Sequence, residues 1–243
     1  MARILIVGAT SAIAIASARL FAARGDDLVL AARNEERLGS LAADLRVRGA
    51  GAVDTVSFMA QPQQDYQGFA GRVWDQGLDC LLLAHGSLRS QDRCQDDVTA
   101  SRREFEVNAL STICLLAAFA GRFAEQGAGN MVVISSVAGD RGRQSNYLYG
   151  SAKAAVSTYC QGLRNRMHSS GVRVITIKPG FVDTPMTAGF EKGLLWTQPE
   201  QIASGILRAL ERGSDVVYLP WFWRYIMLVI RLIPERWFKR LSL

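Results

Sequence analysis

Arg3-Ile-Leu-Ile-Val-Gly8 opens the chain with a short apolar strand, which is followed by a turn of small residues and then by a helical pattern. Apolar runs of strand length go on alternating with helical stretches along most of the sequence. We expect strands at residues 4–7, 27–31, 53–58, 80–84, 131–135, 172–178 and 216–219, and helices at 12–24, 35–48, 66–76, 102–125, 149–169 and 199–211. Strands that are apolar almost throughout are buried on both faces of a sheet. The pattern therefore predicts an α/β fold with a single doubly wound parallel sheet, in a three-layer α/β/α sandwich.

The composition of the 243-residue chain fits one large domain with an ample core. Apolar residues make up 49% of the chain, and no Pro/Gly/Ser-rich linker, internal repeat or charge block divides it. The four cysteines are isolated, which argues against structural zinc and a disulfide framework and fits a reducing cytosol. The sequence has no Cys-x-x-Cys and no His/Cys cluster, so we expect no bound metal. The chain begins with a strand rather than with a signal-peptide core, so we expect a cytoplasmic protein.

A tyrosine and a lysine lie four residues apart in Tyr149-Gly-Ser-Ala-Lys153, within a predicted helix. Side chains at this spacing project from one face of a helix. A nearby ammonium group stabilises a phenolate and lowers a pKa that is ordinarily about 10, which lets tyrosine act as a general acid. Ser136 lies thirteen residues upstream, at the end of an apolar run, where its hydroxyl can hold a carbonyl oxygen. Together these groups are suited to reducing a ketone or oxidising an alcohol.

With these residues the chain resembles the classical short-chain dehydrogenases/reductases over most of its length. The resemblance implies a Rossmann-type sandwich, a nicotinamide dinucleotide cofactor and a catalytic tetrad of asparagine, serine, tyrosine and lysine. The matching positions here are Asn108 (in Phe105-Glu-Val-Asn-Ala109), Ser136, Tyr149 and Lys153. All four have the family's order and spacing, so a coincidental helix pattern is a poor explanation for them.

The turn after the first strand is the expected nucleotide site. It reads Gly8-Ala-Thr-Ser-Ala12-Ile-Ala14 and takes the place of the family's glycine-rich turn, with alanine at the second and third glycine positions. Glycine there lets the backbone approach the pyrophosphate, so a turn with alanines must keep φ negative and accept less room. The helix N-terminus still offers free N–H groups to a phosphate. By position, the resemblance implies cofactor contacts from Gly8, Thr10, Ser11, Ala12 and Ile13.

The end of the second strand, Leu30-Ala-Ala-Arg33-Asn34, indicates which cofactor is preferred. NAD-preferring members of the family carry an aspartate here for the adenosine ribose, and this chain has none. Arg33 instead supplies a guanidinium suited to a 2′-phosphate, with Asn34 beside it. The alternative is that Arg33 simply lies at a solvent-exposed strand end. The absent acid and the present base favour NADP(H).

Two other cofactor positions depart from the family pattern. The third strand ends in Phe58-Met-Ala60, without the family's aspartate toward adenine, and the turn after the fourth strand reads Leu83-Ala-His85-Gly86. By position, Ala84 and Gly86 are still expected beside the cofactor. For His85 we favour a turn residue that satisfies backbone groups over a proton-transfer group.

The segment Lys178-Pro-Gly-Phe-Val-Asp-Thr184-Pro-Met186 resembles the family's Pro-Gly segment after the sixth strand. In relatives, backbone groups and a threonine of this segment hold the nicotinamide carboxamide. The matching cofactor positions are Pro179, Gly180, Val182 and Thr184. Residues near 187–197 then form the expected substrate lid, whose apolar content indicates either a greasy substrate portion or packing onto the body of the protein.

Residues 221–243 form an aromatic and basic arm beyond the predicted domain of residues 1–220. The arm holds three of the five tryptophans and a net charge of +4 out of the chain's +6. Its apolar core, residues 225–233, is far shorter than the ~20 residues needed to cross a bilayer. Aromatic side chains interleaved with cations are typical of a helix in an anionic membrane interface, so we expect peripheral contact with the inner face of the cytoplasmic membrane. The alternative is an arm buried in a homo-oligomer, while nucleic acid is not expected because no separate basic face is visible.

The loop between Ser136 and Tyr149 contains Arg141 and Arg143, which either clamp an anionic substrate group or are solvated loop charges. Together with the basic-aromatic arm, the sequence of this loop and of the Pro-Gly segment resembles the branch that contains decaprenylphosphoryl-2-keto-erythro-pentose reductases. That resemblance implies reduction of a keto-sugar carried on a polyprenyl phosphate.

The first functional hypothesis is therefore NADPH-dependent reduction of a ketone on a lipid-linked or otherwise amphipathic substrate. In this hypothesis Tyr149 protonates the carbonyl oxygen, Ser136 orients it, and Lys153 lowers the tyrosine pKa and binds the nicotinamide ribose. By resemblance, Asn108 holds a water in the proton relay. The alternatives are a soluble 3-oxoacyl-thioester reductase and a catalytically silent dinucleotide-binding regulator, which the altered glycine turn permits. We also expect a homo-oligomer.

Overall fold

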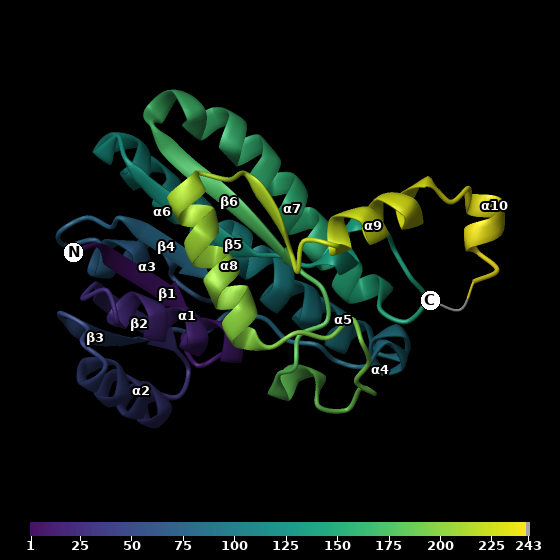
Figure 1. Ribbon diagram of the computed structural model, residues 1–243, viewed down its shortest axis with the longest axis horizontal. Helices are drawn as coiled ribbons and strands as arrows, with labels where there is room; N and C mark the ends of the chain where they lie inside the picture. Colours follow the sequence, from purple (N-terminus) through teal and green to yellow (C-terminus); the bar gives the residue numbers. More distant parts are fainter. Residues whose placement is uncertain (242–243) are drawn as a thin grey trace.

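In the computed structural model, which describes residues 1–241, seven parallel strands form one sheet in the order β3-β2-β1-β4-β5-β6-β7 (Figure 1). The strands are β1 (Arg3–Val7), β2 (Asp27–Ala32), β3 (Val53–Ser57), β4 (Cys80–Leu83), β5 (Gly129–Ile134), β6 (Val172–Pro179) and β7 (Val216–Leu219). The strand order reverses between β1 and β4, and such a switch point is where open α/β sheets bind ligands, beyond the carboxyl ends of the strands. The predicted doubly wound parallel sheet is confirmed.

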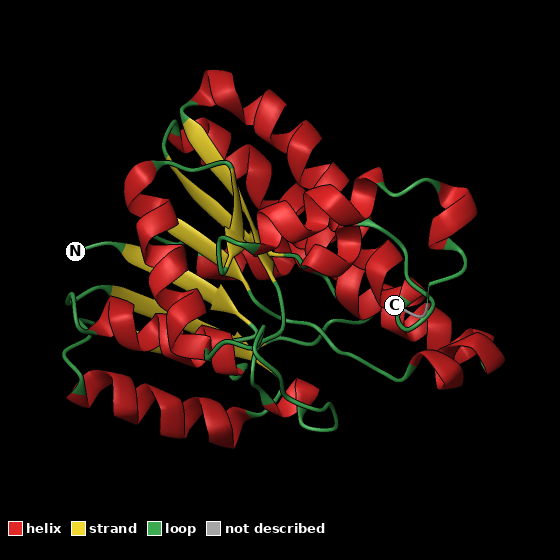
Figure 2. Ribbon diagram, turned by 45° about the vertical axis from the view of Figure 1, so that its right-hand side comes forward, coloured by secondary structure: helices red, strands yellow, loops and turns green. Residues whose placement is uncertain are grey.

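Helices cover both faces of the sheet, as Figure 2 shows. The α-helices are α1 (Ala12–Ala22), α2 (Glu35–Val47), α3 (Tyr66–Val73), α4 (Gln91–Asp96), α5 (Val98–Phe105), α6 (Ser111–Gln126), α7 (Tyr147–Met167), α8 (Pro199–Arg212), α9 (Trp223–Leu232) and α10 (Glu235–Phe238). Along β1, Leu5 belongs to the core shared with α3, α6 and α7, whereas Ile4 and Ile6 belong to the core shared with α1, α2 and α8. Because successive strand residues point to opposite faces, a strand covered on both sides must be apolar throughout.

The helix predicted at residues 102–125 is wrong in its details. Its chain forms α5, then a π-helical turn at Glu106–Leu110, and then α6, while α4 was not predicted. The whole run Val98–Gln126 is long and apolar enough to cross a membrane by length and composition, and an 18-residue window within it has a mean hydropathy of 1.5. However, 56% of that window is buried inside the protein, and α6 contributes side chains to the core beside the sheet. The run is therefore a core helix of this fold.

Candidate active site

The chain segment that follows β5 and the first turns of α7 bring three predicted catalytic residues together. Ser136 directly precedes the 3-10 turn Val137–Asp140, and α7 carries Tyr149 and Lys153. The turn packs tightly on α7, since a Cβ on Gly139 would lie 2.7 Å from the Ala154 nitrogen. This close contact fixes the separation of the serine from the tyrosine and lysine.

Lys153 is almost fully buried, and its position is fixed from both ends. Its backbone carbonyl accepts a hydrogen bond of 3.0 Å from the Ser135 hydroxyl, and its Nζ donates one of 3.1 Å to the carbonyl of Ile134. The ammonium lies 5.7 Å from the centroid of the Tyr149 ring. A Cβ on Gly86 would lie 3.8 Å from the same Nζ and 2.9 Å from Oδ1 of Asn108. The side chains of Asn108 and Lys153 therefore both lie next to Gly86.

Burial, rather than the lysine, dominates the pKa of Tyr149. Loss of hydration raises the pKa of the phenol to about 12, although a hydrogen bond with the Ser136 side chain lowers it. Burial also lowers the pKa of Lys153 to about 8, while the nearby Glu104 carboxylate raises it. The pKa of Tyr149 in the protein alone therefore lies above its ordinary value, whereas we expected a value below it. At neutral pH the phenol keeps its proton and the lysine is mostly charged.

Asn108 lies in the π-helical turn, fully buried, and a carboxylate missed by sequence reasoning fixes its amide. Its Nδ2 donates to Oε1 of Glu104 at 2.9 Å, and its Oδ1 accepts from the backbone nitrogen of Ser87 at 3.1 Å. Glu104 is also buried and accepts a hydrogen bond of 2.8 Å from the Ser87 hydroxyl, with Arg89 at 3.7 Å. Glu104 precedes Asn108 by four residues, so helical spacing was the available signal for this pair.

The turn after β1 has the geometry expected of a nucleotide-binding turn. Gly8 has a φ of +80°, and a Cβ there would lie 2.5 Å from the His85 nitrogen, so only glycine fits. Ala12 and Ala14 lie within α1, and no residue other than glycine has a positive φ in the described chain, so the alanines keep the negative φ that we expected. Ser11 is the N-cap of α1 and accepts a hydrogen bond of 3.3 Å from Ala14 N. Thr10 and Ile13 flank it at this helix N-terminus, which suits a dinucleotide phosphate.

Arg33 and Asn34 follow the end of β2, next to this turn. The strands β1 and β2 pair with Val7 opposite Ala31, and the Ala31 carbonyl accepts a hydrogen bond of 2.8 Å from Gly8 N. Arg33 is exposed and makes no ion pair within residues 1–241, so it is available to an anionic ligand. The Asn34 side chain caps α2, where its Oδ1 accepts a hydrogen bond of 2.8 Å from Arg37 N.

Phe58 after β3 and His85 after β4 belong to the two segments that depart from the family pattern, and their rings pack against each other. Phe58 is buried and packs on Phe69, with ring centroids 4.9 Å apart, and on His85 at 5.9 Å. The His85 Nε2 lies 2.8 Å from the hydroxyl of Ser111, so the expectation that this histidine satisfies backbone groups is wrong. Burial lowers the pKa of His85 to about 3, so the ring is neutral. Ala84 precedes it and donates a hydrogen bond of 2.8 Å to the carbonyl of Val7.

The Pro-Gly segment after β6 brings together the expected nicotinamide positions and the lid. Pro179 ends β6, and Gly180 N donates to the Leu219 carbonyl at 3.0 Å. Val182 is buried and bridges Thr197, which closes the base of the lid. Thr184 caps the short turn Pro185–Thr187 at the start of the lid. Beyond this base Phe190, Leu194 and Leu195 expose their apolar side chains.

A buried ion pair behind Ser136, the predicted catalytic serine, was not visible in the sequence. The Lys178 ammonium on β6 pairs with the Asp140 carboxylate at the end of the 3-10 turn, and both side chains are buried. The Tyr218 hydroxyl donates a hydrogen bond of 2.8 Å to the other Asp140 oxygen. Burial and this carboxylate raise the pKa of Tyr218, so it stays protonated. The pair ties the serine loop to β6 and β7, and no local pattern connects these residues.

Neither interpretation of Arg141 was right, because this side chain binds the C-terminal arm. Its Nη1 donates hydrogen bonds of 2.6 Å to the carbonyls of Ile230 and Ile233 at the end of α9. Its Nη2 lies 2.9 Å from the Glu235 carboxylate, and its guanidinium stacks over the Phe238 ring at 3.6 Å. Helix C-termini attract cations, so Arg141 both caps α9 and holds α10. For Arg143, burial lowers the pKa of the guanidinium.

The arm contributes an aromatic wall next to the Pro-Gly segment. Trp223 is buried, and its indole lies directly against Gly180, where no side chain would fit. Phe181 packs edge-on against Trp223, with centroids 5.3 Å apart, and stacks on Trp196 of the lid at 5.5 Å. The arm, the lid and the Pro-Gly segment therefore meet in one aromatic cluster, Phe181, Trp196 and Trp223.

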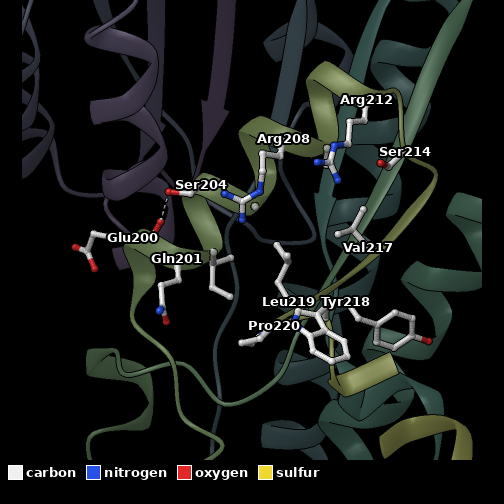
Figure 3. Close-up of a pocket in the computed structure, with 14 residues that line it drawn as sticks. Glu200, Gln201, Ser204, Arg208, Arg212, Ser214, Val217, Tyr218, Leu219 and Pro220 are labelled. Atoms are coloured by element: carbon white, nitrogen blue, oxygen red, sulfur yellow. Dashed lines mark hydrogen bonds between the residues drawn. The ribbon is translucent and has the colours of Figure 1, made fainter. Parts of the chain in front are cut away.

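A hollow of about 760 Å³ lies between α8 and the edge strand β7 (Figure 3). Glu200, Arg208, Tyr218 and Trp221 are among the side chains around it. None of the four predicted catalytic residues lines this hollow. Within residues 1–241 no group of three His, Cys, Asp or Glu side chains is placed to hold a metal ion.

Comparison with known proteins agrees with this geometry. Residues 2–194 match the short chain dehydrogenase family. An uncharacterized oxidoreductase of Mycobacterium tuberculosis is 37% identical over 242 residues, which cover 99% of this chain and 97% of that protein. A short-chain dehydrogenase from Sphingobium yanoikuyae, solved in complex with NADPH, is 30% identical with a TM-score of 0.84, covering 90% of this chain and 88% of that one. A bulky-bulky ketone specific alcohol dehydrogenase from Comamonas testosteroni is 26% identical with a TM-score of 0.81, covering 99% and 90%.

The nucleotide turn, the serine loop and the tyrosine–lysine helix meet at the carboxyl ends of the central strands, as expected for a nicotinamide dinucleotide enzyme. Most of the chain matches the family, and its relatives are oxidoreductases. The chain is therefore an NAD(P)-dependent oxidoreductase of the short-chain dehydrogenase/reductase family.

Proposed function

We propose that this enzyme uses NADPH to reduce a ketone to an alcohol on a lipid-linked sugar or another amphipathic substrate. The observation that carries the reaction is that Ser136, Tyr149 and Lys153 lie close together. Asn108 and Lys153 both lie next to Gly86. When bound, the nicotinamide dinucleotide supplies the hydride. All remaining steps are proton transfer and positioning by side chains of the protein.

The choice of NADPH rests on Arg33. Its guanidinium is exposed beside the nucleotide turn, and the end of β2 has no carboxylate that would repel a 2′-phosphate. The Sphingobium yanoikuyae relative binds NADPH, which supports the same preference. Gly8, Thr10, Ser11, Ala12 and Ile13 would hold the pyrophosphate, while the Pro-Gly segment and Lys153 would hold the nicotinamide side.

Tyr149 supports the reductive direction. A phenol with a pKa raised to about 12 is protonated at neutral pH, so it can give its proton to a carbonyl oxygen that gains negative charge. The hydroxyl of Ser136 would hold the same oxygen in place. The charge of Lys153 stabilises the phenolate that remains after proton transfer. Asn108, fixed by Glu104, would hold a water that returns a proton toward Lys153.

The substrate preference rests on the aromatic cluster Phe181, Trp196 and Trp223, together with the apolar lid side chains. A wall of this kind suits the greasy portion of an amphipathic ketone. Arg141 is occupied by the arm, so it does not support recognition of a phosphate. The resemblance to decaprenylphosphoryl-2-keto-erythro-pentose reductases supports a keto-sugar on a polyprenyl phosphate as the first substrate to try. A homo-oligomer is part of the proposal, because β7 is an edge strand that a second copy can cover.

Initial rates of NADPH and NADH oxidation with a panel of ketones test this function. The panel contains a keto-sugar on a polyprenyl phosphate, a hydrophobic ketone without phosphate and a 3-oxoacyl thioester. We expect turnover with NADPH and the first two ketones. Turnover confined to the thioester would favour the 3-oxoacyl-thioester reductase. Binding of NADPH without turnover of any ketone, and without a keto intermediate accumulating in a deletion strain, would favour the silent regulator.

A further inference from the structure

We propose that α9 and α10 dock the enzyme on an anionic lipid surface through the outer face of the arm, here defined as Trp221, Tyr225, Leu228, Val229 and Leu232. The opposite, inner face of α9 is already occupied by the protein. Trp223 and Met227 are buried against Val137, in the turn that follows the catalytic serine. The arm is therefore fixed in orientation, and its outer face points away from the body.

The outer face is apolar although it faces solvent. Its five residues recur at intervals that place them on one side of a helix, with Trp221 just before the first turn. Trp221 is 71% exposed, Val229 63% and Leu232 72%. A helix that is apolar on two opposite faces is typical of a buried segment. Within residues 1–241 the protein covers the inner face of α9 and leaves the outer face exposed, so a second apolar environment would cover the outer face.

The charges around the outer face identify that environment. The arm carries five cations, Arg224, Arg231, Arg236, Lys239 and Arg240, and all five are exposed. Within residues 1–241 none of them pairs with a carboxylate, and the arm's acid Glu235 is bound by Arg141. Cations beside an apolar row with tryptophan and tyrosine match the headgroup and acyl layers of an anionic bilayer.

A second copy of the chain fits the same face less well. In a twofold-symmetric dimer each arm meets the other arm, which brings five cations against five others. Their repulsion opposes such a contact, because Glu235, the one acidic side chain of the arm within residues 1–241, already pairs with Arg141. A membrane span is also excluded for α9 itself, since its 10 residues are about half the ~20 that a bilayer requires. The helix lies along the surface.

Docking in this way brings the active site close to the lipid. Figure 1 shows α9 and α10 extending at the right-hand end of the molecule, on the side where α4 and α5 also lie. The inner face of α9 touches the serine loop, and Trp223 touches the Pro-Gly segment. This part of the inference rests on the proposed amphipathic substrate. The polar headgroup of that substrate would reach the catalytic residues while its hydrocarbon chain stays in the bilayer. The lipid contact itself does not depend on the reaction.

Co-sedimentation of the full-length protein with vesicles tests the contact. We expect binding to vesicles of mixed phosphatidylcholine and phosphatidylglycerol, weaker binding as salt rises, and little binding to phosphatidylcholine alone. Val229→Glu should weaken binding on the order of tenfold, because it removes apolar area and adds a negative charge. Val47→Glu is the matched control: Val47 is 89% exposed at the end of α2, and its variant should bind like the wild type.

The cations give a second, independent measurement. Lys239→Ala and Arg240→Ala should each weaken binding about fivefold, and each should reduce the dependence on salt. All variants should keep their thermal unfolding, NADPH binding and turnover of a water-soluble ketone, since the changed side chains are exposed. The inference is overturned if the wild type ignores anionic vesicles at low salt, or if Val47→Glu loses as much binding as Val229→Glu. A dimer in light scattering that Val229→Glu dissociates would overturn it in favour of a second copy. Loss of ketone turnover with intact vesicle binding would instead contradict the proposed function alone.

Discussion

The predicted nucleotide end of the candidate site is built by one local segment, whereas its predicted substrate end is assembled from segments that are distant in the chain. At the nucleotide end, β1, the turn at Gly8 and α1 follow one another directly, and their backbone creates the binding surface. At the substrate end, the serine loop is held by Lys178 on β6, by Tyr218 on β7 and by the arm through Arg141. The difference predicts that substitutions at the nucleotide end mainly weaken ligand binding, and that those at the substrate end mainly lower the stability of the fold.

The largest effect is expected where the two ends meet, at Tyr149. Tyr149→Phe should lower ketone turnover by about 10²–10⁴-fold, because the general acid is lost. NADPH affinity and thermal unfolding should stay unchanged. Tyr147→Phe is the control, since Tyr147 is exposed two residues earlier and its hydroxyl donates a hydrogen bond of 3.4 Å to Gln95. Equal losses in both variants would remove Tyr149 from the mechanism.

At the substrate end, Asp140→Asn should lower the free energy of unfolding by about 3–5 kcal/mol, because it leaves the Lys178 ammonium buried without a charged partner. Urea denaturation measures the change. Asp44→Asn is the comparison among the helices next to β1 and β2, where Asp44 on α2 pairs with Arg19 on α1 and with Arg48, and all three side chains are partly exposed. Its cost should stay below about 1 kcal/mol. Similar costs would mean that the buried pair is not special to the substrate end.

At the nucleotide end, Gly8→Ala should cost about 1–3 kcal/mol, shown as weaker NADPH binding and lower stability. The reason is the φ of +80° and the Cβ that would lie 2.5 Å from the His85 nitrogen. Gly39→Ala is the control in α2, where a Cβ meets nothing within 4 Å. It should stabilise the protein by about 0.5–1 kcal/mol. If Gly8→Ala behaved like Gly39→Ala, the turn would not require a glycine.

Arg33→Ala tests ligand binding at the nucleotide end, and it should leave the stability of the fold unchanged. Loss of a charged hydrogen-bond donor should weaken NADPH binding by about 10–100-fold and leave NADH binding nearly unchanged. Isothermal titration with both nucleotides measures this. Arg37→Ala, an exposed arginine of α2, should change neither affinity. Equal losses for NADPH and NADH in Arg33→Ala would show that Arg33 does not read the 2′-phosphate.

The smallest effect is expected in the pH dependence of reduction. As pH rises through about 8, Lys153 loses its proton, whereas Tyr149, with a pKa of about 12, keeps its own. Reductive kcat/KM should therefore fall by about tenfold per pH unit above that value. Glu104→Gln removes a carboxylate that raises the Lys153 pKa, so it should move this fall to lower pH. If kcat/KM stays constant as pH rises through about 8, the reaction does not require the charged form of Lys153.

The sequence alone determined the features that are encoded by local periodicity. Alternating apolar strands and helical stretches predicted all seven strands and a parallel sheet with helices on both faces. The resemblance to the family, rather than periodicity, predicted the nucleotide turn at Gly8. The four-residue spacing of Tyr149 and Lys153 predicted a shared helix face, because a helix repeats every ~3.6 residues. The family resemblance added Ser136 and Asn108, which the fold brings to the same end of the sheet.

Only the tertiary structure decided which distant charges meet. Nothing near Asp140 in the chain indicates that Lys178 and Tyr218 bind it, and nothing near Arg141 indicates that it caps α9. The tyrosine pKa was also decided in this way: nearness to a lysine in sequence predicted a lower value, but burial by the surrounding elements raises it. Periodicity fixes the face on which a side chain lies, whereas hydration and charge pairing depend on what packs against that face after folding.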